Sequence, residues 1–169
     1  MNSKRLFFAL WPDHRHRDRL RDVINSVAKT GEGQPVDRRT WQVTRACIGA
    51  FPEHRVPFLL ERAAEIRVEP FRLNFDRLEY WPRPRVASLT AATVPAELQA
   101  LVDALNSVLR NLGIEPEEHV YRPHITVVRR ARAFTTERLA QRTSTEWSSF
   151  ELMESVSGPG GVSYVPLKQ

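Results

Sequence analysis

The residues best suited to chemistry lie together in one short segment, Tyr121–Arg130, which has the sequence YRPHITVVRR. Side chains of a β-strand alternate between its two faces, so in a strand His124 and Thr126 point to the same side. An imidazole can accept or donate a proton, a hydroxyl can hold a phosphoryl oxygen, and an arginine such as Arg129 or Arg130 can neutralise its charge. The pattern indicates an anion site with acid–base chemistry. A structural histidine on a strand face is the alternative.

The excess of positive charge consists almost entirely of arginine. The chain has 25 lysines and arginines against 20 aspartates and glutamates, a net charge of +5, and its only lysines are Lys4, Lys29 and Lys168. A planar guanidinium group suits phosphate and stacks on bases, so this balance favours a phosphate-rich partner such as RNA. A codon bias toward arginine is the alternative interpretation, since many of these arginines lie on helix faces beside acids.

Length and composition disfavour several classes of protein. The 169 residues, 41% of them hydrophobic, favour one domain over residues 1–169 with a real core. No run approaches the roughly 20 apolar residues of a membrane helix. The first apolar run ends at Pro12, too early for a secretory signal, so the sequence predicts a cytoplasmic protein.

The sequence offers no pattern for a disulfide, a metal ion or a cofactor. The single cysteine, Cys47, excludes an internal disulfide, and we expect it to be a small buried apolar residue rather than a nucleophile. Neither a glycine-rich phosphate loop nor a metal-spaced cluster is present. We therefore expect no cofactor and no metal ion.

Apolar periodicity predicts strands and helices that alternate along the chain, with hairpin-like pairs of strands among them. Strands are predicted at Arg5–Trp11, Trp41–Gly49, Phe71–Trp81, Arg85–Thr93, Tyr121–Arg130, Phe150–Val156 and Val162–Leu167. Helices are predicted from Pro12-Asp13 to the segment Gly31–Pro35, around Val56–Ala63, from Pro95 to Gly113, and as a short helix over Thr135–Thr143. This mixture favours an α+β fold over a doubly wound parallel sheet.

Several segments together carry a family resemblance. His124–Val127 has the form His-x-Thr-x, Arg5–Pro12 is a strand with aromatic residues, Leu78–Arg85 is a proline-containing hairpin, and Gly160–Tyr164 is a glycine pair followed by tyrosine. These features resemble the two-histidine (2H) phosphoesterases, in particular the RNA 2′,3′-cyclic phosphodiesterase / 2′-5′ RNA ligase family. The resemblance implies two pseudo-symmetric lobes, each an antiparallel sheet backed by helices and each with one His-x-Thr-x motif, around a central basic cleft.

The chain departs from the family pattern at the first of the two motifs. The segment Trp41–Gly49 has the sequence WQVTRACIG, where family members would have Leu-His-Leu-Thr-Leu. Thr44 is kept, Gln42 stands in place of the histidine, and Arg45 stands in place of an apolar residue. Strand alternation places Arg45 on the face away from Gln42 and Thr44.

The resemblance implies metal-free hydrolysis of RNA 2′,3′-cyclic ends, with 2′-5′ ligation as a further activity. One histidine would activate water and the other would protonate the departing ribose oxygen, while the threonines and an arginine hold phosphate oxygens. Glutamine cannot titrate, so we expect a weakened enzyme that uses His124, with Thr126, Thr44 and Gln42 as the other catalytic positions. The alternatives are an inactive protein of the same fold that binds RNA ends or nucleotides, and an enzyme for another cyclic or branched nucleotide.

The remaining histidines are poor substitutes for the missing one. His54 begins the next helix, His119 lies in a polar turn, and His14 and His16 lie at the start of the first helix, where we expect them to be exposed.

The phosphate- and base-binding residues follow less directly from the pattern. The resemblance favours Arg129, with Arg130 as second choice, although alternation from His124 places Arg130 on the motif face; a β-bulge at the strand end would reconcile the two. Phe7, Tyr80 and Trp81 are candidates to stack on a nucleobase, or they belong to the core. The expected partners are RNA ends or cyclic and 2′-5′-linked nucleotides, and the expected state is a monomer.

Overall fold

The computed structural model of the chain describes residues 2–30, 32–83, 85–116 and 122–168. Its strands are β1 Ser3–Leu10, β2 Gln34–Pro35, β3 Val43–Pro52, β4 Phe71–Trp81, β5 Val86–Thr90, β6 His124–Arg129, β7 Glu137–Trp147, β8 Glu151–Gly158 and β9 Gly161–Leu167. Its α-helices are α1 His14–Ala28, α2 Val56–Ala64 and α3 Ala96–Asn111, with short 3-10 helices η1 Arg38–Thr40 and η2 Glu53–Arg55. In this described part of the chain, every helix is too short or too polar to cross a membrane.

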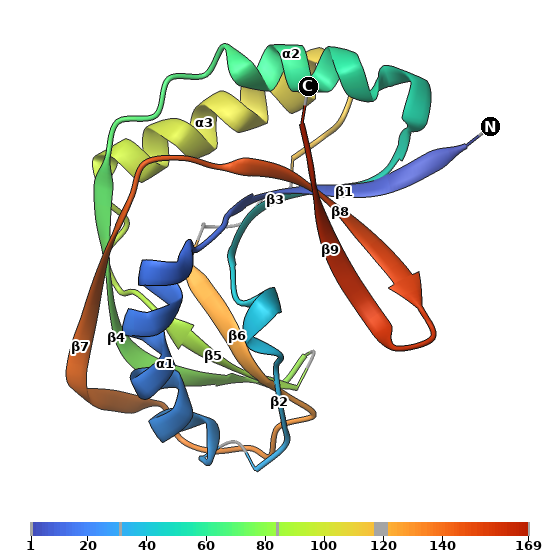
Figure 1. Cartoon of the computed structure of the whole chain (residues 1–169). Helices are drawn as coiled ribbons and strands as arrows, with labels where there is room; N and C mark the ends of the chain where they lie inside the picture. Colours follow the sequence, from blue (N-terminus) through green and yellow to red (C-terminus); the bar gives the residue numbers. More distant parts are fainter. Residues whose placement is uncertain (1, 31, 84, 117–121, 169) are drawn as a thin grey trace.

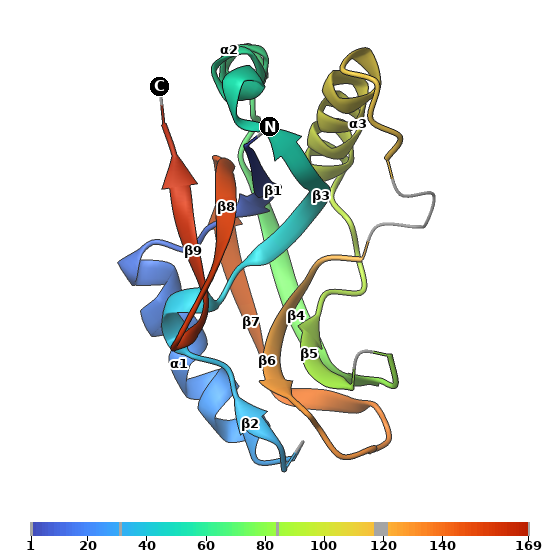
Figure 2. The same cartoon turned by 90° about the vertical axis from the view of Figure 1, so that its right-hand side faces the viewer.

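The strands form two antiparallel sheets, which confirms the predicted α+β fold class. Sheet A has the order β3-β1-β8-β9, and sheet B has the order β2-β6-β5-β4-β7. Helices α2 and α3 lie over sheet A, whereas α1 lies against sheet B (Figures 1 and 2). The two strands that carry the motif segments, β3 and β6, come from different sheets and contact each other.

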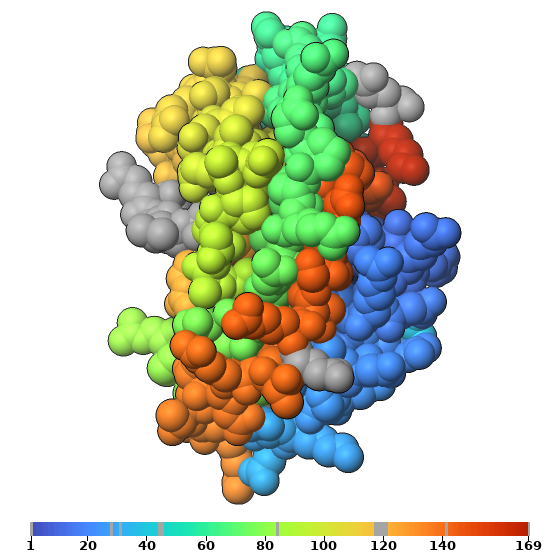
Figure 3. All heavy atoms as spheres, turned by 90° about the vertical axis from the view of Figure 1, so that its left-hand side faces the viewer, coloured from blue at the N-terminus to red at the C-terminus, as the bar shows by residue number. Residues whose placement is uncertain are grey.

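Helices α1 and α3 each follow a strand of one sheet along the chain but pack on the other sheet. Helix α1 follows β1 of sheet A but packs on β6 and β7 of sheet B. Helix α3 follows β5 of sheet B but packs on β3 of sheet A. The space-filling view shows α1 (blue) lying along β7 (orange) (Figure 3). The two lobes are therefore interlocked rather than joined by one linker.

Strand alternation divides the apolar side chains of β1 between two clusters. Leu6, Phe8 and Leu10 enter the main core, where Phe8 and Leu10 are fully buried. Phe7 and Ala9 point to the other face and pack with Met153 in a smaller cluster. Full burial of a large apolar side chain contributes about 1.5–3 kcal/mol to the free energy of folding, so the main core holds the strand in place. Phe7 lies on the other face of the sheet, in the smaller cluster.

His16 joins α1 to β7 and is not the exposed residue that the sequence suggested. Its ring stacks on Trp147 with centroids 4.7 Å apart, and its Nε2 contacts the backbone carbonyl of Glu146. Its Nδ1 lies 2.8 Å from Asp13 Oδ1, and Asp13 also caps the helix by accepting from the backbone N–H of His16. That backbone hydrogen bond holds the pKa of Asp13 below its usual value. The side chain of His16 is thus committed to packing.

The short helix predicted over Thr135–Thr143 is wrong, because β7 occupies Glu137–Trp147. Thr143, Thr145 and Trp147 are buried at alternate positions, and β7 pairs with β4 from Phe71 opposite Trp147 onward. Two β-branched threonines followed by an aromatic residue suit a half-buried strand better than a helix. The other predicted strands and helices are confirmed with shifted ends, and Gly113 ends α3 with φ +81°.

Gly33 allows the short strand β2 to approach the end of β6. A Cβ at this position would lie 2.3 Å from the carbonyl oxygen of Arg129 and 2.6 Å from that of Arg130, so only glycine fits. Beyond it, Gln34 pairs with Arg129, and the backbone N–H of Val36 donates to the carbonyl of Val127 at 2.9 Å. The chain that leads to Gln42 is therefore fastened to β6.

Candidate active site

His124 and Thr126 lie on one polar face of sheet B. His124 pairs with Thr90 of β5, and Thr126 pairs with Ser88. Directly paired residues of antiparallel strands share a face, so these four side chains line the same surface. Ser88 and Thr90 are almost fully buried, and the Ser88 hydroxyl has no hydrogen-bond partner among the described residues. Of these four side chains, the half-buried His124 and Thr126 are therefore the two that a ligand can reach.

His124 is held in one tautomer. Its Nδ1 lies 2.8 Å from the carbonyl oxygen of Arg122. A carbonyl oxygen can only accept, so Nδ1 carries the proton and Nε2 of the neutral ring keeps its lone pair. Burial lowers the pKa of His124 below its ordinary value, and the hydrogen bond to the Arg122 carbonyl opposes this shift without reversing it. The neutral ring is thus favoured, and its Nε2 is suited to accept a proton.

An ion pair behind His124 was not assigned a role from the sequence. Glu79 Oε1 and Oε2 accept hydrogen bonds from Arg122 Nη2 at 2.7 and 2.5 Å. Burial opposes ionisation of Glu79, but the hydrogen bond and charge of Arg122 prevail and keep the pKa of Glu79 below its usual value. The Arg122 guanidinium also lies 5.9 Å from the Trp81 ring centroid, and Trp81 meets His124 edge-to-face at 4.4 Å. Alternation in β4, which places Glu79 and Trp81 on one face, could have revealed this group.

We predict that Glu79→Gln lowers the pKa of His124. The carboxylate favours the imidazolium form, and its removal also leaves the Arg122 charge unopposed, so both changes disfavour protonation of the ring. An NMR titration of the His124 ring should show its midpoint at lower pH, and Glu79→Asp, which keeps the charge, should shift it less. An unchanged midpoint in Glu79→Gln would show that the carboxylate does not act on His124.

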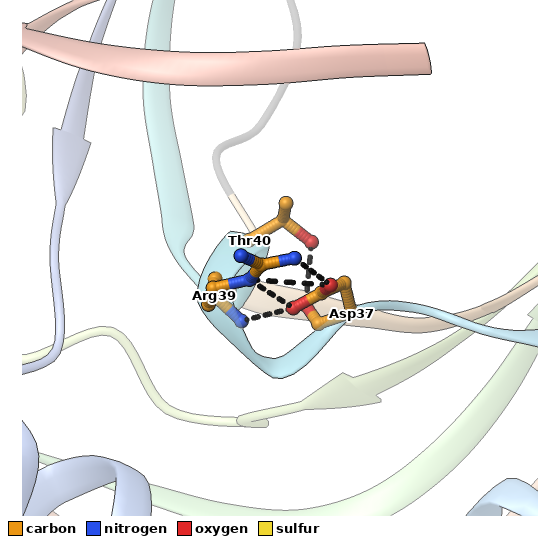
Figure 4. A network of polar contacts seen from close by, with 3 residues as sticks. All are labelled: Asp37, Arg39 and Thr40. Carbon is orange, nitrogen blue, oxygen red and sulfur yellow. Dashed lines mark hydrogen bonds and ion pairs between the residues drawn. The ribbon is translucent and has the colours of Figure 1, made fainter. Parts of the chain in front are cut away.

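Gln42 follows a compact 3-10 turn. Asp37 accepts from the backbone N–H of Arg39 at 2.8 Å and from its guanidinium at 2.8 Å, while the Thr40 hydroxyl donates to the Asp37 carbonyl (Figure 4). The side-chain hydrogen bond from Arg39 lowers the pKa of Asp37 to about 2. Trp41 is then buried in the main core. This turn and this anchor determine where the Gln42 side chain begins.

The Gln42 side chain lines a pocket of about 230 Å³ on sheet A. The pocket is lined by Arg5, Leu6, Phe7, Gln42, Cys47, Gly49, Ser155 and Tyr164. Gln42 Oε1 is buried and has no hydrogen-bond partner among the described residues. Its capacity to accept a hydrogen bond is therefore unused within the described part of the chain. Cys47 is exposed, not buried as expected, because its position opposite Phe7 places it on the pocket side of the sheet.

Irregular pairing in β3 explains why simple alternation fails beside Gln42. Phe8 pairs with Ala46 and Ala9 with Thr44, so Arg45 is an extra residue in the ladder. Such a bulge breaks the alternation from which the sequence placed Arg45. The backbone of Thr44 lies opposite Ala9, whose neighbour cluster includes Phe7. The side chains of Thr44 and Arg45 lie outside the described residues, so their roles stay predictions.

A bulge in β6 brings Arg129 to the His124 face. Ser88 pairs with Thr126 and Ala87 with Val128, which leaves Val127 as the extra residue. After this shift Arg129 lies opposite Val86, and Val86 also pairs with Trp81. The geometry therefore favours Arg129 over Arg130, which lies beyond the strand with φ +51°. Its contact with phosphate stays a prediction.

The three aromatic candidates are placed differently. Phe7 lines the Gln42 pocket, is 8% exposed and meets Tyr164 edge-on at 5.2 Å. Trp81 lies beside His124. Tyr80 points to the opposite face of β4, where it packs against Phe134 at 5.8 Å and the main core. The structure does not bring Tyr80 to the site, because it is one residue out of step with Trp81.

None of the other described histidines joins this site. His54 and His14 are exposed, in η2 and at the start of α1. His16 packs on Trp147. His119 lies outside the described residues. The polar face of sheet B therefore has one titratable ring, the Thr126 hydroxyl and an exposed guanidinium, which suits binding of an anion and transfer of one proton by His124. The non-titrating amide of Gln42 lines the separate pocket on sheet A.

Comparison with known proteins finds similar sequences. Residues 48–154 match the family model described as the 2′-5′ RNA ligase superfamily. A protein of Aeropyrum pernix named RNA 2′,3′-cyclic phosphodiesterase is 31% identical over 115 residues, which is 66% of this chain and 65% of that protein. A protein of the same name from Escherichia coli is 28% identical over 167 residues, 98% of this chain and 95% of its own length.

A solved structure extends the similarity to the fold. The crystal structure of E. coli LigT complexed with 3′-AMP superposes with a TM-score of 0.86 at 29% sequence identity. The match covers 99% of this chain and 97% of that one. The A. pernix protein, by contrast, is matched over less than two thirds of its length.

Proposed function

The chain belongs to the 2′-5′ RNA ligase superfamily, and we propose that it hydrolyses the 2′,3′-cyclic phosphate end of RNA without a metal ion, with His124 as the single acid–base side chain. The observation that carries this proposal is the 2.8 Å contact between His124 Nδ1 and the Arg122 carbonyl oxygen, from which the proton is assigned to Nδ1 and the lone pair to Nε2. The names of the relatives and the 3′-AMP bound to LigT support the substrate class. Ligation of 2′-5′ ends is a further proposed activity of the same site.

The proposed mechanism begins with His124 as a base. Nε2 accepts a proton from water, the resulting hydroxide attacks phosphorus, and one of the two ribose P–O bonds breaks. Thr126, Thr44 and Arg129, with Arg130 as second choice, hold the non-bridging oxygens. Gln42 accepts a hydrogen bond through Oε1 and orients the ribose, but it cannot supply a proton to the departing oxygen. That proton comes from solvent, which makes the step slow.

The proposed base-binding residues are Phe7 and Trp81, one on each sheet. Phe7 faces the Gln42 pocket and Trp81 lies beside His124. Stacking on an aromatic ring is worth about 1–3 kcal/mol per base and does not depend strongly on its identity. We also propose that the protein acts as a monomer in the cytoplasm.

The pH dependence of the reaction distinguishes one titrating group from two. We expect kcat/KM to rise with pH through a pKa below 6.5, because burial lowers the pKa of His124 and only its neutral form accepts a proton. Above that pKa the rate should stay level, since no catalytic acid is lost. Initial rates measured over a pH series test this, and a bell-shaped profile would show that a second group titrates.

The proposal is tested directly with an RNA oligonucleotide that ends in a 2′,3′-cyclic phosphate. Release of a monophosphate end by the protein, and its absence in a chain lacking the His124 ring, supports hydrolysis. The second candidate function is binding of RNA ends without turnover, and Gln42 is the residue that favours it. Tight binding of the end, with protection of the His124 ring in NMR spectra but no product, would establish that alternative.

A further inference from the structure

Two loops at one end of sheet B bring exposed arginines together. The turn between β4 and β5 carries Arg83 and Arg85, and the chain that leaves β6 carries Arg130. The backbone N–H of Ala131 donates to the carbonyl of Arg85 at 3.0 Å, so the two loops are joined. We refer to Arg83, Arg85 and Arg130 as the loop arginines; all three side chains are exposed.

The loop arginines keep their charge without an internal partner. In the described part of the chain no carboxylate lies within ion-pair distance of any of the three, whereas neighbouring Arg132 pairs with Glu32 at 3.3 Å. Unpaired guanidinium groups gathered on one surface raise the local concentration of anions. The surface is therefore suited to an anionic partner.

The backbone presents two of these arginines in an unfavourable conformation. Arg85 has φ +64° and Arg130 has φ +51°, a region that L-residues other than asparagine and aspartate seldom adopt. Glycine or asparagine would fit both positions with less strain. Long charged side chains at two strained, adjoining positions indicate that what they contact, rather than the turn itself, accounts for their presence.

The position of the loop arginines favours RNA over other polyanions. Arg129, which precedes Arg130, lies on the face shared by Trp81 and His124, so the charged surface continues from the candidate active site. The exposed large apolar side chains of the described chain, Phe58, Val156, Val162 and Val165, all lie on other elements. The loops thus lack the apolar residues with which peripheral proteins enter a lipid surface.

We propose that the loop arginines bind the phosphodiester backbone of single-stranded RNA on the 5′ side of the end held at His124. This inference rests on the proposed function, and it makes an oligonucleotide, rather than a cyclic mononucleotide, the preferred ligand. The contacts are to phosphate, so they add affinity without base preference. Arg83 and Arg85, in the turn between β4 and β5, do not reach the reacting phosphate of the terminal nucleotide.

The test compares two triple variants with the same loss of charge. Arg83→Gln/Arg85→Asn/Arg130→Asn removes the loop arginines and tolerates the positive φ values, whereas Arg15→Gln/Arg19→Gln/Arg110→Gln removes three exposed arginines on α1 and α3. Affinity for a short single-stranded RNA with a 2′,3′-cyclic phosphate end is measured by fluorescence anisotropy at several salt concentrations. Hydrolysis of a 2′,3′-cyclic mononucleotide is measured alongside.

The first triple variant should lower the slope of log affinity against log salt by about 2, since each phosphate contact of a single strand contributes about 0.7. Between 50 and 200 mM salt this corresponds to roughly 20-fold less loss of affinity than in the parent protein. The control variant should keep both the parent slope and mononucleotide turnover. Arg83→Gln/Arg85→Asn, which leaves Arg130 in place, should also keep mononucleotide turnover while it reduces the slope by about 1.4. Arg83→Glu, on the open turn, should weaken RNA binding in a chain that folds normally.

Equal slopes for the two triple variants would overturn the proposal, since they would reduce the effect to net charge. If the first triple variant loses as much affinity for vesicles of anionic lipid as it loses for RNA, the loop arginines bind a membrane surface instead. If neither RNA nor mononucleotide is hydrolysed but the slopes still differ as expected, the proposed hydrolysis fails while the RNA surface stands.

Discussion

Gln42→His is expected to raise kcat/KM for a 2′,3′-cyclic-phosphate-ended RNA by roughly 10²–10⁴-fold. The reason is that the departing ribose oxygen develops negative charge, and a neighbouring imidazolium can neutralise it by proton transfer while an amide cannot. This range corresponds to about 3–5 kcal/mol of activation free energy. The new ring would extend from a position that already lines the pocket shared with Phe7.

The gain should come with a change in the pH profile. Gln42→His should add a falling limb at alkaline pH, because the new acid must be protonated to act. Gln42→Asn, which keeps an amide, is the matched control and should gain nothing. If Gln42→His and Gln42→Asn both lose activity, the Gln42 amide takes part in substrate recognition. A different cyclic or branched nucleotide then becomes the better candidate for the substrate.

His124→Ala is expected to reduce kcat/KM by roughly 10²–10⁴-fold or to abolish turnover. His124 is the only described histidine with a free ring nitrogen on the polar face of sheet B, and its tautomer leaves Nε2 available. RNA affinity should fall much less than the rate, since Thr126, Arg129 and the loop arginines remain. The measurement is single-turnover hydrolysis together with anisotropy on the same RNA.

Exposed His54 provides the control for this loss. His54→Ala removes a histidine from η2, outside the candidate site, and should leave both the rate and the affinity unchanged. Retention of full activity in His124→Ala would mean that another group acts as the base, and the mechanism built on the Arg122 carbonyl would have to be abandoned. Unchanged activity in both variants is therefore incompatible with the proposal.

Most of the fold could be predicted because its apolar patterns are local. The α1, α2 and α3 helices and the alternating strand β4 follow from spacing within a dozen or so residues. The strand β7 could not be separated from a helix, since polar residues fill most of its length and its pairing with β4 is a distant contact. The two-residue strand β2 is too short for any periodic signal.

The candidate site shows the limit of alternation more sharply. His124 and Thr126 were placed on one face correctly, because β6 is regular between them. Beyond Thr126 and around Arg45, single extra residues shift the register, and a bulge depends on partners far away in the chain. For the same reason the ion pair between Glu79 of β4 and Arg122, which precedes β6, could not be predicted from either segment alone, although alternation places Glu79 on the face of Trp81.

The order of strands in sheet A also has a consequence for biosynthesis. β1 is made before β3 and β8, yet it lies between them, and the bond from Lys4 to Glu154 joins residues 150 positions apart at 3.2 Å. At about 5–20 residues per second, the ribosome needs roughly 8–30 s after β1 to make β8, its second partner strand. During that time the nascent chain carries Leu6, Phe7 and Phe8 on an unpaired strand edge, which invites association with other chains. Chaperone contact with β1 would protect this edge until β8 is made.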